Sequence, residues 1–184
     1  LAEVEKINGI RLLPKEKLEK LYNTLNEKYK NEFPDGTPLV CACEKGRVED
    51  VEGMIRGARA AGMDVTAMVS EVGKDSDDYS WTPLMAAAWY EHSTIIEILL
   101  QYNADTATTN DFGWNALHWA ASYNETTTTI VRLLLNNMKL EDINQRNTDG
   151  YTPLDLCYNE NGSPIREQLI QLIRQKGGKR GSEI

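Results

Sequence analysis

The stretch Thr82-Pro83-Leu84-Met85-Ala86-Ala87 decides the fold, because the chain repeats it three more times in altered form. The other copies are Thr37-Pro38-Leu39-Val40-Cys41-Ala42, Asn115-Ala116-Leu117-His118-Trp119-Ala120 and Thr152-Pro153-Leu154-Asp155-Leu156-Cys157. Their first residues lie 45, 33 and 37 positions apart along the chain. Self-similarity at periods of roughly 20 to 50 residues is typical of proteins built from stacked units.

Each copy has the chemistry of a helix start. Thr or Asn at the first position can accept a hydrogen bond from a free N–H of the first helical turn. Pro at the second position suits the first helical residue, whose N–H has no partner within the helix. The Leu and the small residues that follow allow close helix packing. The pattern therefore predicts short helices over about 38–45, 83–90, 116–123 and 153–160.

A second helix is expected after each of these, because apolar residues recur there at helical spacing. They are Val51, Met54 and Ile55, then Ile96, Leu99 and Leu100, then Ile130 or Val131 with Leu133 and Leu134, and lastly Leu169, Ile170, Leu172 and Ile173. A polar turn follows the first three pairs. Two antiparallel helices and a loop cannot bury their apolar face alone, so the copies are expected to stack into one continuous core.

This order of turn, tetrapeptide, two helices and turn resembles the ankyrin repeat, whose tetrapeptide is T-P-L-H and whose period is about 33 residues. The tetrapeptide His occurs once, as His118. The resemblance covers residues 32–176 and implies an all-α ankyrin-repeat solenoid of about four helix-turn-helix repeats with β-hairpin-like loops and an N-terminal helical cap. The expected repeats are 32–76, 77–109, 110–146 and 147–176.

The two ends of the chain are expected to flank this stack. Residues 1–31 form a capping segment, in which an amphipathic helix over about 14–31 places Leu18, Leu21 and Leu25 on one face. Such a helix would cover the open face of the first repeat, since terminal repeats need a polar outer side. Residues 177–184 are predicted to be a flexible tail.

The first repeat is longer than the others. The turn 62–67 should be followed by an additional loop near 68–76, which makes a long finger with an acidic tip at Asp75, Asp77 and Asp78. Two interpretations stay open: a loop that grips a partner, and a surface insertion that the fold tolerates.

Composition and charge limit the kinds of molecule that the chain is expected to bind. The 184 residues carry a formal charge of −8, spread as +2 over residues 1–31, −12 over 32–175 and +2 over 176–184. The acidic body should repel nucleic acid and anionic membranes, so a basic or neutral protein or peptide is favoured. No apolar run approaches the roughly 20 residues of a membrane-spanning helix. Three cysteines make no disulfide framework, which favours a reducing compartment, cytoplasmic or nuclear.

The sequence offers no convincing catalytic or metal-binding set. His118 is expected to hold the tetrapeptide turn, and His92 to lie at a turn between helices. Cys41 and Cys43 are two apart on one helix, lack a second Cys or His pair at ligand spacing, and therefore predict no zinc site. Cys157 is expected to be a buried thiol. No cofactor is expected, and the chain is interpreted as non-enzymatic.

Aromatic residues recur at the repeat junctions. Trp81, Trp114 and Tyr151 directly precede three tetrapeptides, and the resemblance implies that such hairpin tips and first-helix ends line a concave groove. Large rigid rings are typical of binding hot spots. The predicted partner-binding residues are Trp81, Trp89, Tyr90, Asp111, Phe112, Trp114, Tyr123, Asp149 and Tyr151. The alternative is that the rings pack on the next hairpin; Trp119 is expected in the core.

The predicted function is a monomeric protein–protein interaction module that holds a partner peptide or domain in this aromatic and acidic groove. One alternative is a reader of methylated or basic histone-like tails, because rings and carboxylates can surround a cation. Another is the targeting or regulatory ankyrin segment of a larger enzyme or channel, which a first residue other than Met permits.

Overall fold

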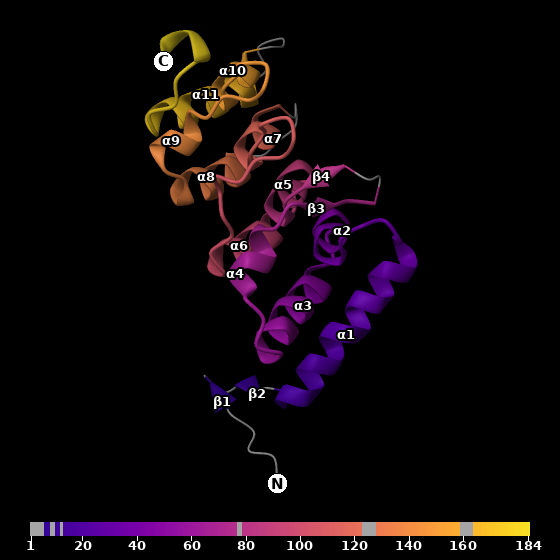
Figure 1. Ribbon diagram of the computed structural model, residues 1–184. Coiled ribbons are helices and arrows are strands. Elements are labelled where there is room, and N and C mark those ends of the chain that lie inside the picture. Colours follow the sequence, from indigo (N-terminus) through magenta and orange to yellow (C-terminus); the bar gives the residue numbers. More distant parts are fainter. Residues whose placement is uncertain (1–5, 8–9, 12, 77–78, 123–127, 159–163) are drawn as a thin grey trace.

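The computed structural model describes residues 6–7, 10–11, 13–76, 79–122, 128–158 and 164–184. Its helices stack in two layers (Figure 1). One layer contains α2 (Pro38–Glu44), α5 (Pro83–Trp89), α7 (Ala116–Ser122) and α10 (Pro153–Cys157). The other contains α1 (Lys15–Glu32), α3 (Val48–Ala60), α6 (Ser93–Gln101), α8 (Thr128–Asn137) and α11 (Pro164–Gln175). The prediction of an all-α solenoid is confirmed.

Three of the four repeated segments start their helices with the predicted side-chain cap. The Thr82 hydroxyl accepts from Met85 N at 3.1 Å, the Asn115 side-chain oxygen from His118 N at 3.1 Å, and the Thr152 hydroxyl from Asp155 N at 3.3 Å. Thr37 is the exception: its hydroxyl accepts instead from Lys74 N at 2.8 Å, so the cap expected there is wrong. The Thr37 hydroxyl, which could have capped α2, therefore bonds to the hairpin that contains Lys74.

The tetrapeptide leucines form the line along which the units share a core. Leu39, Leu84, Leu117 and Leu154 are all 5% exposed or less, and the neighbouring small residues of the same helices are buried as well. These small side chains let adjacent helices approach closely. Each unit thereby buries its apolar face against the next unit.

Helix α1 packs along α3, where the capping helix was expected. Two glycines of α3 make this approach possible. A Cβ added at Gly57 would lie 2.5 Å from the Leu18 carbonyl oxygen, and one at Gly53 would lie 2.8 Å from Leu25. Tyr29 of α1 is fully buried and donates a hydrogen bond to Asp50 of α3 at 2.9 Å. The short strands β1 (Lys6–Ile7) and β2 (Ile10–Arg11) precede this helix.

The extra length of the first unit folds differently from the expected loop. Helix α4 (Val65–Ser70) spans the end of the predicted turn and the start of that loop, and its first turn is capped by Asp64, whose carboxylate accepts from Ala67 N at 3.0 Å. The predicted polar turn over 62–67 therefore ends early. Aspartate before Val-Thr-Ala has the pattern of a capped helix start, which is the signal the sequence interpretation passed over.

After α4, strands β3 (Gly73–Lys74) and β4 (Ser80–Trp81) pair antiparallel as a hairpin. Asp75 is 2% exposed and accepts from Tyr79 N, so the prediction that it forms an exposed acidic tip is wrong. Asp77 and Asp78 lie outside the described residues. Glu44 accepts from Ser76 N at 2.9 Å; burial raises the pKa of that carboxyl, but its bonds to Lys45 and Ser76 outweigh the burial and lower it.

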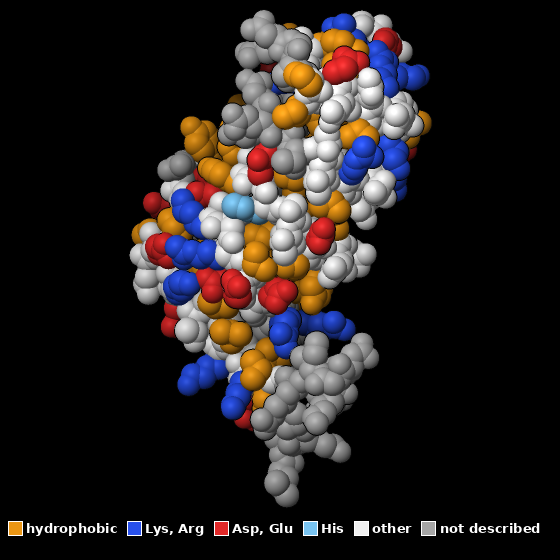
Figure 2. All heavy atoms as spheres, turned by 180° about the vertical axis from the view of Figure 1, so that it is seen from behind, with side chains coloured by type: hydrophobic (Ala, Val, Ile, Leu, Met, Phe, Trp, Pro, Cys, Tyr) orange, Lys and Arg blue, Asp and Glu red, His pale blue; other side chains and the backbone are white. Residues whose placement is uncertain are grey.

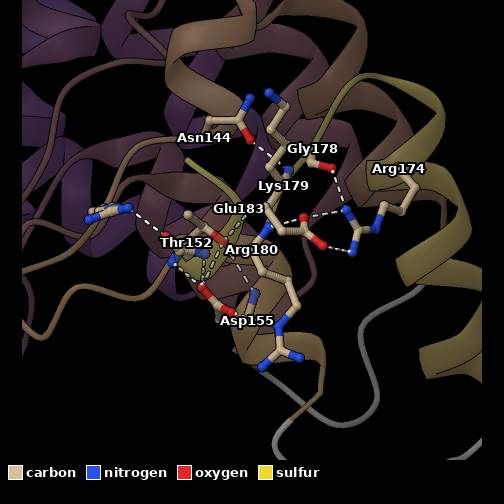
Figure 3. Close-up of polar contacts among 10 residues, drawn as sticks. Asn144, Thr152, Asp155, Arg174, Gly178, Lys179, Arg180 and Glu183 are labelled. Atoms are coloured by element: carbon tan, nitrogen blue, oxygen red, sulfur yellow. Dashed lines mark hydrogen bonds and ion pairs between the residues drawn. The ribbon is translucent and has the colours of Figure 1, made fainter.

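The C-terminal segment is docked on the last unit (Figure 3). Its 3-10 turn (Gly181–Glu183) returns to α11, where Arg174 forms a two-pronged ion pair with Glu183 at 2.5 and 2.7 Å. The Asp155 carboxylate accepts from Gly181 N at 2.7 Å and from Arg180 Nε at 3.0 Å. These bonds join residues that the sequence predicts to be a flexible tail to the last unit.

The docked segment stands where the next unit would place its hairpin. In the third unit, the fourth tetrapeptide residue, His118, bonds to the carbonyl of Tyr151 in the following hairpin. In the last unit the same position is Asp155, which accepts N–H groups of the docked segment, while Thr152 donates to the Lys179 carbonyl at 2.8 Å. Histidine at this position faces a carbonyl acceptor, whereas aspartate faces N–H donors. The replacement of His by Asp thus matches the change of hydrogen-bonding partner.

Replacing Glu183 with alanine is expected to undock this segment locally. The amides of Gly178 and Gly181, which bond to Ile173 O and Asp155, should exchange with solvent severalfold faster, because the ion pair to Arg174 no longer holds the turn. Hydrogen exchange read by NMR measures this. The control is Glu167→Ala, which removes an exposed carboxylate from α11, the helix that also carries Arg174. Unchanged exchange in the Glu183 variant would contradict the docking.

Candidate partner-binding surface

All four tryptophans of the chain lie in one cluster, which we call the tryptophan cluster: Trp81, Trp89, Trp114 and Trp119. Trp119 of α7 is at its centre. Its ring centroid lies 4.4 Å from that of Trp81, 4.4 Å from that of Trp114 and 5.4 Å, edge to face, from that of Trp89. Offset and edge-to-face rings at these distances attract each other beyond their buried area.

This arrangement differs from the prediction that Trp81, Trp89 and Trp114 line a groove open to a partner. Trp81, expected at a partner surface, is 5% exposed, and Trp119, expected in the core, is only partly buried. Trp81 and Trp114 occupy equivalent places in successive units, and Trp119 fills the space between them. Trp89 and Trp114 keep part of their surface in solvent, so the cluster has an inner and an outer side.

Two indole N–H groups of the tryptophan cluster have no hydrogen-bond acceptor. The Nε1 atoms of Trp81 and Trp119 are both buried and unpaired within the described part of the chain. Neighbouring ring faces are weak acceptors for such N–H groups, which suits their position among other indoles. The cluster therefore gains from ring packing and burial rather than from polar pairing.

Several large rings of the described residues remain open to solvent; among them Tyr158, 43% exposed, has the Arg180 guanidinium over its ring at 4.7 Å. Phe112 is 59% exposed, Tyr151 46% and Tyr90 39%. Tyr79, 61% exposed, was missed, although it stands three residues before Thr82 just as Phe112 stands three before Asn115. Tyr123 lies outside the described residues. We call Tyr79, Tyr90, Phe112 and Tyr151 the exposed rings.

Two hairpin tips that carry these rings share a turn that the sequence interpretation overlooked. The Asn110 side-chain oxygen accepts from Phe112 N and Trp114 N, at 3.1 and 3.0 Å. The Asn147 oxygen accepts from Asp149 N and Tyr151 N in the same way, at 3.0 and 2.9 Å. The signal was present as Asn, then Gly three residues later, then an aromatic residue. Asparagine oxygens that bond to the following backbone fix such turns.

The glycine of each tip has a positive φ, which an L side chain rarely adopts. The angle is 71° at Gly113 and 83° at Gly150. A Cβ at Gly113 would also lie 3.1 Å from the backbone of Asn147 in the next tip. The tips are joined directly as well, since Thr148 N donates to the Phe112 carbonyl at 3.0 Å. Adjacent tips therefore hold their rings at a fixed spacing.

The two predicted carboxylates have different surroundings. Asp111 is exposed and accepts from the Ser80 hydroxyl at 2.9 Å, so it also links two neighbouring hairpins. Asp149 is exposed, and its carboxylate makes no hydrogen bond or ion pair within the described residues. Figure 2 shows acidic side chains among apolar ones across the middle of one face of the stack, with basic side chains next to several of them. A basic group would meet favourable charge at these tips.

His118 has the structural role that the resemblance implied. The ring is fully buried, its Nε2 bonds to the Tyr151 carbonyl at 3.2 Å, and its Nδ1 accepts from Asn115 N at 3.2 Å. Burial lowers its pKa from 6.5 to about 4, although the backbone bonds favour the proton. The imidazole therefore stays neutral near pH 7 and joins the third unit to the tip of the fourth.

His92 and the three cysteines lie in structural positions. His92 bonds to the Glu44 carbonyl at 3.0 Å, which places it at the turn before α6 as expected. Cys41, Cys43 and Cys157 are free and buried, and burial raises the pKa of each thiol, to about 12 for Cys41 and Cys157. Thiols that stay protonated are poor nucleophiles and poor metal ligands. The described residues contain no group of three or more His, Cys, Asp or Glu side chains placed to hold a metal ion.

No described helix is both long enough and apolar enough to cross a lipid bilayer.

Stacked helix pairs with hairpins between them, capped at both ends of the stack, define a repeat solenoid. A family model described as Ankyrin repeats (3 copies) matches residues 11–110 and 102–178. The chain therefore belongs to the ankyrin-repeat family, whose repeats are general protein–protein interaction modules. Comparison with curated proteins gave no match.

Proposed function

We propose that this chain is a non-enzymatic interaction module that binds a partner protein or peptide on the exposed rings. Supporting this, rings that are 39% to 61% exposed stand on tips and helix ends, and the tips of Phe112 and Tyr151 are joined by a backbone hydrogen bond from Thr148 N to Phe112 O. A rigid support lowers the conformational entropy lost on binding. The exposure of these rings carries the proposal, because exposed apolar surface on a protein often marks an interaction site.

The charge around the exposed rings favours a basic partner. Asp149 offers an unpaired carboxylate, and Asp111 lies beside Phe112 on the neighbouring tip. Residues 32–175 carry a charge of −12, which should speed the approach of a basic surface. We therefore infer a partner segment that combines an apolar or aromatic anchor with lysine or arginine.

The alternative of a methyl-lysine reader is less favoured. Such a reader surrounds the ammonium group with ring faces at about 6 Å or less from each centroid. The rings of the tryptophan cluster instead lie against each other, with 4.4 Å between the centroids of Trp81 and Trp119. No observation of the described residues favours this alternative, nor the role of a targeting segment in a larger protein.

Replacing Phe112 and Tyr151 together with alanine should weaken partner binding about tenfold or more, as truncation of hot-spot rings does. Both side chains are largely exposed, so the melting temperature should barely change. The measurement is quantitative affinity capture from the source cell, followed by titration of the captured partner. Trp81 is left intact because it is buried.

A matched control removes two exposed apolar side chains away from the tips, Leu140→Ala with Ile165→Ala. The control should bind the partner as the wild-type chain does. If both double variants bind equally well, or if the control loses binding instead, the exposed rings are not the contact surface.

A further inference from the structure

A second concave site lies where the first unit carries its extra helix. A cleft of about 520 Å³ opens between α1, the start of α2, α3 and α4. Tyr22 and Asn26 line it from α1, Met54 from α3, and Ala67 and Met68 from α4. The volume is within the range of roughly 300 to 1,000 Å³ found for ligand sites. The cleft shares no lining residue with the exposed rings or the tryptophan cluster.

The cleft is mainly apolar and adaptable. Three of the five methionines of the chain, Met54, Met63 and Met68, line it. Unbranched thioether side chains adjust to the shape of what they contact, which is why methionine is frequent at surfaces that accept varied apolar groups. Met63 is 43% exposed, so part of this apolar surface already faces solvent.

The polar lining of the cleft is negatively charged, and some of its hydrogen-bonding groups have no partner among the described residues. Asp64 and Glu71 are its only charged residues, and no lysine or arginine lines the cleft. Asp64 uses one carboxylate oxygen to cap α4. The Glu71 carboxylate and the Asn26 side-chain amide bond to no residue that the structure describes. An occupant with a positive charge and a hydrogen-bonding backbone would complement these groups.

The walls are held in place before anything binds. Gly53 and Gly57 let α1 pack closely on α3. At the other wall, the Ser70 hydroxyl donates to Thr66 O at 2.8 Å and accepts from Asp105 N at 2.9 Å, which ties the end of α4 to the following unit. A pre-formed site loses little ordering entropy on binding.

We propose that this cleft binds a peptide segment that pairs an aliphatic side chain with an adjacent lysine or arginine. The aliphatic group contacts Met63 and Met68 above the buried Met54, and the cation lies near Glu71 and Asp64. The extra helix α4 builds one wall, so the added length of the first unit creates a recognition site. This inference is independent of the function proposed for the exposed rings.

The test uses the full chain labelled with ¹³C at its methionine methyl groups. The probe is the acetylated hexapeptide amide of alternating leucine and lysine, and its counterpart with glutamate replacing lysine. The lysine peptide should shift the signals of Met63 and Met68 most, while buried Met85 and partly buried Met138, both outside the cleft, serve as internal references. Equal shifts at all five methionines, no shifts, or the same response to the glutamate peptide would overturn the proposal.

Two sets of variants sharpen the result. Asp64→Ser with Glu71→Gln keeps the helix cap and removes both charges, and should weaken the lysine peptide about three- to tenfold. Ala67→Arg should abolish its binding by filling the cleft with a cation, whereas Ala61→Arg, exposed and outside the lining, should not. Binding that survives Ala67→Arg overturns the site. If the methionine signals shift with protein concentration in the absence of peptide, the cleft binds a second copy of the chain. That result would overturn the proposal of a peptide ligand.

Discussion

Replacing Trp119 with alanine is expected to lower the free energy of unfolding by about 3 kcal/mol, the lower end for truncating a large aromatic residue because Trp119 keeps some exposure. The ring contacts Trp81, Trp89 and Trp114 at once, and its loss opens a cavity between two repeats. Trp81 would then lose the partner that covers it. The effect should exceed that of removing any exposed ring.

Urea unfolding followed by circular dichroism measures this change. Tyr79→Ala is the matched control: it removes a ring that is 61% exposed and should alter stability by less than about 0.5 kcal/mol. Because every tryptophan of the chain is in the cluster, emission of the remaining three should shift to longer wavelength in the Trp119 variant. Equal stability of the two variants would show that the rings do not support one another.

Acidification is expected to destabilise the protein through His118. Its pKa is about 4 when folded and 6.5 ordinarily, so between these values the unfolded chain binds a proton that the folded chain does not. Stability is therefore present above about pH 6.5 and falls as the pH drops, by about 2 kcal/mol between about pH 7 and about pH 5. The carboxyls of Glu44 and Asp155 have lowered pKa values, so their contributions are lost only at still lower pH.

The same unfolding experiment at several pH values, on wild type and on His118→Gln, isolates this effect. The glutamine amide can still donate to the Tyr151 carbonyl, but it does not titrate. The variant should be less stable at neutral pH and should lose about 2 kcal/mol less on going to about pH 5. Parallel pH profiles of the two proteins would mean that His118 is not the group responsible.

The elements that could be predicted are those whose signals are local. The helix starts at Pro38, Pro83, Ala116 and Pro153 follow from the cap and proline chemistry of the repeated segments. Burial of Cys157 and the structural role that the resemblance implied for His118 agree with their positions in the same pattern.

The candidate site was predicted only in part. Phe112, Tyr151 and Tyr90 are exposed near the tips, but Trp81 is buried in the tryptophan cluster. Ring spacing along the chain shows which rings lie in neighbouring units. It does not show that Trp119, from inside a helix, fills the space between two of them. Whether a ring is presented or packed depends on what lies across the repeat boundary.

The C-terminal end of the stack also could not be predicted from local sequence patterns. Asp155, one residue of the repeated pattern, is where the C-terminal segment attaches through Gly181 and Arg180. The expectation of a flexible tail rested only on the general mobility of chain ends. The segment is ordered by contacts with residues about 25 positions earlier, which no local pattern contains.

The sequence by itself determined the repeat, its helix pairs and the acidic character of the stack, because these depend on residue spacing, caps and summed charge. Only the tertiary structure decided which rings are open to solvent, how the ends are closed and that the added helix forms a cleft. Those features arise where side chains from different units compete for the same space, and packing rather than propensity settles that competition.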